Sequence, residues 1–209
     1  LNKPSFNKIL RGPHPKDLSV GVVGGMFAAK LVSENQIPKD AILELTRIGT
    51  VLPGKYYISF YIGTCFLALN EPEAALKHFN KAVDLQPTRQ DSAAIYSYMG
   101  ICYKDMQQYR EALAVLKKGE GYDNERTDIY NLMGFCHFKL REHEEAIECF
   151  NRVLALDPTS AIDYANIASN YRDMGEKENA IRYYVMALEL DPSITFAREN
   201  LERLQHEGK

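Results

Sequence analysis

Cysteine is the residue type in this sequence that could hold a metal or carry out redox chemistry, and three cysteines recur in one local pattern. Cys65, Cys102 and Cys136 each follow a glycine by two positions, and the last two lie 34 residues apart. A zinc site needs several sulfurs about 2.3 Å from one metal, and a disulfide needs Cα atoms within about 7 Å. Equivalent residues on stacked helices are instead about 8 to 10 Å apart. The pattern therefore favours reduced cysteines that fill a core.

Other motifs that could support catalysis are incomplete. His137 follows Cys136 directly, but adjacent helical residues point about 100° apart and do not face each other, so we expect a buried, hydrogen-bonded histidine. The stretch HEEAI at 143–147 lacks the second histidine of H-E-x-x-H, and GVVGG at 21–25 does not fit the G-x-G-x-x-G pattern of dinucleotide-binding loops. The sequence thus predicts no enzyme activity, no cofactor and no metal.

The composition bounds the class of protein and of partner. The chain has 209 residues, of which 45% are hydrophobic, enough to bury a core. Its formal net charge of -3 supplies no excess of cations for a phosphate backbone, so we expect no nucleic-acid partner. The local basic cluster of Lys3, Lys8, Arg11 and Lys16 is interpreted as a solvated tail.

The sequence also indicates the cellular compartment of the protein. The longest apolar run, at 20–29, is glycine-rich and shorter than the roughly 18 residues of a membrane span, so no transmembrane segment is expected. The chain begins at Leu1 rather than Met and lacks the apolar stretch of a secretory signal, which is consistent with a processed or excised piece of a longer protein. Four cysteines without a close pair favour reduced thiols and a cytoplasmic protein.

A repeat of 34 residues positions all of these groups. Its copies span 22–55, which is degenerate, 56–89, 93–126, 127–160 and 161–194, with Gln90 to Ser92 as an insertion. The twentieth place is always alanine, the eighth is small, and the twenty-fourth is large and apolar. In order, these places hold Ala41, Ala75, Ala112, Ala146 and Ala180; Ala29, Gly63, Gly100, Gly134 and Ala168; and Leu45, Phe79, Leu116, Phe150 and Tyr184. Small residues opposite bulky ones let helices approach closely, so each copy is predicted to be a packed helix hairpin.

Prolines mark the ends of the predicted helices. A ring that cannot continue a helix ends the second helix of the hairpin, and the thirty-second place holds Pro53, Pro87, Pro158 and Pro192. Pro38 and Pro72 stand 34 residues apart at the expected start of the second helix, where a missing N–H is tolerated. This agreement supports the degenerate first copy.

These features resemble the tetratricopeptide repeat (TPR), with a small eighth residue, an aromatic eleventh residue such as Tyr103, alanine at the twentieth place and proline near the end. The resemblance covers 22–194, with departures such as His137 at the aromatic place. Segment 195–209 is similar to the polar helix that caps such arrays, and 1–21 is expected to be a linker or tail. The resemblance implies an all-α fold, a right-handed superhelical solenoid of stacked helix-turn-helix repeats with a C-terminal capping helix.

The resemblance also implies a binding surface. In this family the first helices of successive repeats line a concave groove through their second, fifth, sixth, ninth, twelfth and thirteenth places. Aromatic side chains there would anchor apolar groups, and asparagine amides would bond a peptide backbone. The candidate partner-binding residues are Phe60, Thr64, Ser97, Tyr98, Ile101, Lys104, Asn131, Phe135, Phe138, Asn166, Ser169, Arg172 and Asn200. The alternative interpretation is that individual aromatic residues pack between repeats.

From the resemblance we expect a non-catalytic scaffold that binds a peptide or a partner's helix in this groove. Two alternatives stay open: the chain is the regulatory or targeting domain of a larger enzyme or assembly factor, or it self-assembles into a homo-oligomer through its apolar first copy. One subclass is excluded. No register starting at the first, second or third copy supplies the lysine, asparagine and arginine set with which family members grip the terminal carboxylate of heat-shock chaperones.

Overall fold

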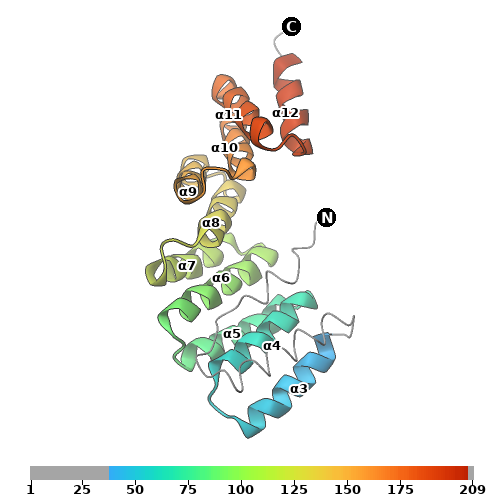
Figure 1. Ribbon diagram of the computed structural model, residues 1–209, viewed down its shortest axis with the longest axis vertical. Helices are drawn as coiled ribbons and strands as arrows, with labels where there is room; N and C mark the ends of the chain where they lie inside the picture. The colour runs from blue at the N-terminus through green and yellow to red at the C-terminus, as the bar shows by residue number, and fades with distance from the viewer. Residues whose placement is uncertain (1–37, 207–209) are drawn as a thin grey trace. The chain divides into compact units, whose positions relative to one another are not determined.

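Residues 38–206 are described by the computed structural model, and within that range every regular element is an α-helix (Figure 1). The predicted all-α class is therefore confirmed. The expected tail at 1–21 and the first helix of the degenerate copy, with Ala29, lie outside the described residues. The helices are α3 (Pro38–Val51), α4 (Tyr56–Ala68), α5 (Pro72–Asp84), α6 (Arg89–Asp105), α7 (Tyr109–Tyr122), α8 (Thr127–Lys139), α9 (His143–Leu156), α10 (Ala161–Asp173), α11 (Lys177–Leu190) and α12 (Thr195–His206).

The helices belong to two compact units, one that ends at Asn124 and one that begins at Glu125. In the N-terminal unit α3 to α7 pack in chain order, each against the next, and in the C-terminal unit α8 to α12 do the same. Helices joined by such short connections run antiparallel to their neighbours. Consequently α8, α10 and α12 share one general direction and begin at the same end of the C-terminal unit.

The two helices of each hairpin pack closely at the positions that the repeat pattern predicts. An added Cβ at Gly100 would lie 2.5 Å from Leu116 Cδ2, and the equivalent distances are 2.6 Å at Gly63 and 2.7 Å at Gly134, each to the side chain at the twenty-fourth place. No real Cβ fits at such distances, so a larger residue would force the two helices apart. The alanines of the twentieth place are also buried, at 1% exposure for Ala41 and 0% for the other four.

Helix ends also follow the sequence. The helices α3 and α5 begin at Pro38 and Pro72, and the second helix of each proline-containing copy ends two or three residues before its proline. The turn between the two helices places the fifteenth residue in the left-handed region, with φ near 60° at Asn70, Gln107 and Arg141 and 80° at Gly175. A left-handed residue at this point ends the first helix and reverses the chain.

The insertion Gln90 to Ser92 adds a helical turn to the start of α6. This helix has 17 residues, whereas α4, α8 and α10 have 13 each. Thr88 caps it by accepting a hydrogen bond from the Asp91 N–H at 3.2 Å, and the Tyr56 hydroxyl donates to the buried carboxylate of Asp91. Arg89 donates from Nε to the Tyr122 carbonyl at 2.8 Å and so satisfies the end of α7.

Candidate functional site

The residues that suggested metal or redox chemistry lie in the core. Cys65, Cys102 and Cys136 are free thiols with exposures of 7%, 0% and 0%, which confirms the prediction that they fill the core. Burial raises the pKa of Cys65 to about 11 and that of Cys102 to about 12, so both stay protonated near neutral pH. Among residues 38–206 no three histidine, cysteine or acidic side chains gather as a metal site would require. His137 is half-buried and hydrogen-bonded, with Nδ1 2.7 Å from Glu142 Oε2.

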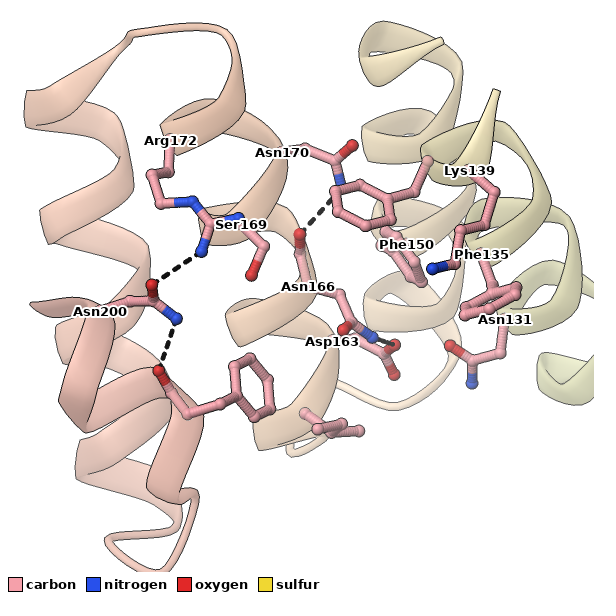
Figure 2. A pocket seen from close by; sticks show the side chains of 13 residues that line it. Asn131, Phe135, Lys139, Phe150, Asp163, Asn166, Ser169, Asn170, Arg172 and Asn200 are labelled. Carbon is pink, nitrogen blue, oxygen red and sulfur yellow. Dashed lines mark hydrogen bonds between the residues drawn. The ribbon is translucent and has the colours of Figure 1, made fainter. Parts of the chain in front are cut away.

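A pocket of about 550 Å³ lies in the C-terminal unit, where α8, α10 and α12 face one another (Figure 2). Most of its residues come from the first helices of the last two repeats and from the capping helix. Its volume suits a few amino-acid side chains. The lining consists of Asn131, Phe135, Phe138, Lys139, Phe150, Ile162, Asp163, Asn166, Ser169, Asn170, Arg172, Phe196 and Asn200.

Three apolar side chains in this lining are exposed to solvent. The exposed fraction is 38% for Phe135, 46% for Ile162 and 37% for Phe196. Ile162 and Phe196 are each the second residue of their helix, so they lie at the end of the pocket where α10 and α12 begin. Exposed apolar side chains are ordinary when scattered, but three in one hollow form a surface that a second apolar group would cover.

Amides and a buried carboxylate form the polar part of the lining. Asp163 is fully buried and accepts hydrogen bonds from Ser160 Oγ at 2.6 Å and from Asn166 Nδ2 at 3.3 Å. Burial raises the pKa of Asp163, and hydrogen bonds from Ser160, Asn166 and Asn131 partly offset that rise. Because Asn131 belongs to α8 and Asn166 to α10, the carboxylate ties two successive first helices together.

Asn170 extends this network toward α9. Its side chain is 1% exposed and donates from Nδ2 to the Asn166 carbonyl at 2.9 Å (Figure 2). Its Oδ1 lies 3.0 Å from Nδ1 of His143. Both groups of the amide are therefore used inside the protein. Asn170 shapes the pocket wall rather than offering a free group to a ligand.

Arg172 joins three helices at the other side of the pocket. Its Nη1 donates to Asn200 Oδ1 on α12 at 2.8 Å, and its Nε and Nη2 donate to Asp173 at 2.8 and 2.6 Å. The guanidinium also hydrogen-bonds the Tyr184 hydroxyl on α11, and that hydroxyl lies 3.0 Å from Ser169 Oγ. The side chain expected to offer its charge to a partner is therefore largely engaged within the protein.

The structure brings seven of the thirteen sequence-predicted residues together in this pocket. They are Asn131, Phe135, Phe138, Asn166, Ser169, Arg172 and Asn200. The other six belong to the N-terminal unit and do not line it: Phe60, Thr64, Ser97, Tyr98, Ile101 and Lys104.

Two of those six are too buried to contact a partner. Phe60 is 0% exposed and Ser97 2% exposed, so their assignment to an open groove is wrong. The Phe60 ring centroid lies 5.2 Å from that of Tyr98 and 5.9 Å from that of Phe79. Aromatic rings of neighbouring helices thus fill this face with their own contacts, as the alternative interpretation held. Thr64 donates back to the Tyr61 carbonyl of its own helix at 2.8 Å.

Sequence reasoning missed six of the lining residues, for two different reasons. Lys139, Ile162 and Phe196 occupy the thirteenth or second place, so the same place rule would have found them. Asp163, Asn170 and Phe150 stand at places that normally face inward. Their part in the pocket depends on side-chain packing, and no pattern in the sequence signals it.

Comparison with known families matches three parts of the chain. The tetratricopeptide-repeat models match residues 60–89, 127–160 and 164–194, which fall within three of the repeats defined above. A comparison with curated proteins gives no match. Within residues 38–206, no helix combines the length and apolar character that crossing a membrane requires.

Solved structures with a similar fold are helical-repeat proteins. MamA from Desulfovibrio magneticus RS-1, from residue 41 onward, has a TM-score of 0.74 at 17% identity and covers 83% of this chain and 96% of its own. YrrB, described as a TPR protein with an unusual peptide-binding site, has a TM-score of 0.72 at 18% identity and covers 95% of this chain and 98% of its own. At these identities the likeness shows the fold, and the family matches add the repeat type. Residues 60–89, 127–160 and 164–194 are therefore tetratricopeptide repeats.

Proposed function

We propose that this chain is a non-catalytic protein-interaction scaffold whose C-terminal pocket holds an extended segment of a partner protein. The observation that carries the proposal is the convergence of exposed apolar side chains and amides on one hollow between α8, α10 and α12. Membership of a repeat family that serves protein–protein contacts supports the class of function. The proposal applies equally to a free-standing scaffold and to the interaction domain of a larger protein.

The two parts of the lining have different roles in this proposal. Phe135, Ile162 and Phe196 bury an apolar side chain of the partner, which contributes most of the affinity. The amides of Asn131 and Asn166 hydrogen-bond the partner's backbone, because an amide offers both a donor and an acceptor. An extended segment suits such a site since its side chains alternate in direction and leave the backbone accessible.

The pocket is organised before any partner arrives. Asp163 holds Asn166 in place, and Arg172 is fixed by Asp173 and Asn200. Side chains that are already ordered lose less conformational entropy on binding, so more of the contact energy appears as affinity. Four buried free thiols suit a reducing compartment, and we place the protein in the cytoplasm.

Parallel capture experiments from native lysate test this function. We expect the wild type and Val185→Ala to retain the same protein, and the double variant Phe135→Ala/Phe196→Ala to lose it. Val185 is a matched control because it is an exposed apolar residue of the same unit, at 36%, on α11 outside the pocket. Circular dichroism and thermal melts establish that all variants are folded. Retention of the same protein by the double variant at the wild-type level would contradict the proposed site.

A further inference from the structure

Three charged side chains line the pocket, and two of them are held in contacts within the protein itself. The carboxylate of Asp163 is buried under donors from Ser160 and Asn166. The guanidinium of Arg172 pairs with Asp173 at 2.6 Å. Burial keeps the Asp163 carboxylate from direct contact with a ligand, and the charge of Arg172 is matched by that of Asp173.

Lys139 is the third charged side chain, and it is different. Its Nζ lies 5.4 Å from the ring centroid of Phe135, a cation–π contact that leaves the charge in place. Among residues 38–206 no carboxylate forms an ion pair with it. Figure 2 shows its ammonium group directed toward the pocket beside Phe135. One uncompensated positive charge therefore stands next to an exposed apolar side chain.

We propose that the occupant of the pocket is an extended partner segment that carries an acidic side chain beside its apolar anchor. The inference rests on the proposed function and specifies the chemistry of its ligand. The apolar side chain packs on Phe135, Ile162 and Phe196, and the Asp or Glu carboxylate pairs with the Lys139 ammonium. Charge complementarity selects this occupant over a basic or uncharged segment.

The spacing of the two ligand groups follows from the geometry. A carboxylate in contact with Lys139 Nζ lies beside the Phe135 ring, since the two groups are 5.4 Å apart. In an extended chain, side chains two residues apart point to the same side and are separated by roughly 7 Å. The acidic residue is therefore expected two positions from the anchor.

Selection from a phage-displayed library of random peptides tests the inference, and it does not require the natural partner to be identified. Wild-type protein is compared with Lys139→Glu, which reverses the charge at the pocket, and with Lys118→Glu. Lys118 is a matched control because it is an exposed lysine on α7, outside the pocket. A parallel selection on Phe135→Ala shows which peptides depend on the pocket.

The proposal predicts that wild type and Lys118→Glu enrich peptides with Asp or Glu two positions from a large apolar residue. Lys139→Glu should enrich Lys or Arg at the acidic position instead. For a synthetic peptide from the wild-type selection, Glu→Gln should weaken binding roughly two- to five-fold at low salt, as an exposed ion pair does. Added salt should reduce this difference.

Failure of this inference is distinguishable from failure of the proposed function. Peptides enriched in apolar residues without an acidic preference would overturn the inference of an acidic ligand. An acidic preference that Lys139→Glu leaves unchanged would do the same. Both results would leave the pocket as the binding site. Enrichment that Phe135→Ala does not alter, or no enrichment above a protein-free matrix, would overturn both.

Discussion

Burial sets the chemistry of the cysteine thiols at the scale of single residues. Cys102 is 0% exposed, and burial raises its pKa from 9.0 to about 12. The thiol of the unfolded chain ionises at a lower pH than that of the folded chain. Ionisation of this thiol in the unfolded chain therefore lowers the free energy of unfolding as the pH rises from about 9 toward 12. Below pH 8 the thiol is protonated in both states and does not change this free energy with pH.

Cys102→Ala should remove this pH dependence. At neutral pH the substitution should cost on the order of 1 kcal/mol, since both residues are small. Between pH 8 and pH 10 the wild type should lose about 1.4 kcal/mol more unfolding free energy than the variant, the linkage expected when one thiol ionises only in the unfolded chain. Urea unfolding at both pH values measures the difference. Parallel losses in the two proteins would show that Cys102 is ionised in the folded state.

Tyr184 brings a hydroxyl to a place that other repeats fill with Phe or Leu. It is 0% exposed, its hydroxyl lies 3.0 Å from Ser169 Oγ, and burial raises its pKa. Phe79 and Phe150 occupy the same place, so Tyr184→Phe should keep the fold and lose only the hydrogen bonds, at about 1 kcal/mol. The ring fills the core, while the hydroxyl positions Ser169 and Arg172 in the pocket.

A double-mutant cycle measures this link. Tyr184→Phe and Ser169→Ala should show a coupling of at least about 0.5 kcal/mol in urea unfolding, as contacting residues do. Tyr184→Phe combined with Ser193→Ala, a change in the exposed turn before α12, should be additive. Additivity in the first pair would mean that the Tyr184 hydroxyl does not position Ser169.

At the scale of the helix, the close approach of the two helices in a repeat depends on the alanine at the twentieth place. Ala146→Leu puts a larger side chain at a position with 0% exposure on α9, and overpacking of this kind costs roughly 1 to 3 kcal/mol. Ala155→Leu on the same helix is the matched control because Ala155 is exposed. Thermal and urea unfolding should show a loss for the first variant alone. Equal stability of the two would contradict the repeat register.

Several helix boundaries were predictable from the sequence because they have a local cause. Pro38 and Pro72 begin helices, and the pairing of Gly100 with Leu116 follows from a fixed spacing. Which residues of each helix are exposed to solvent was harder to predict. Phe60 and Phe135 both stand on first helices, yet Phe60 is buried by Tyr98 and Phe79 while Phe135 is 38% exposed. The identity of the neighbouring side chains decides this difference. A rule based only on the position of a residue within the repeat cannot predict it.

At the scale of the whole chain, the described residues form two compact units, and the candidate site belongs to one of them. The sequence predicted a binding surface that runs from the copy at 56–89 through the copy at 161–194 to the capping helix. The pocket instead gathers residues of α8, α10 and α12, together with buried groups such as Asp163 that no pattern signals. The N-terminal unit packs its aromatic residues against one another, so the partner contacts are expected between residues 125 and 206.

The dissociation constant of the captured partner for Phe135→Ala, measured at two salt concentrations, tests the binding site most directly. Removal of a central apolar anchor should cost about 2 kcal/mol, or roughly thirty-fold in affinity. The ratio to wild type should be the same at both salt concentrations because the contact is apolar. Val185→Ala should bind like the wild type. Unchanged affinity for Phe135→Ala, with a loss for Val185→Ala, would place the partner outside the pocket and contradict the account.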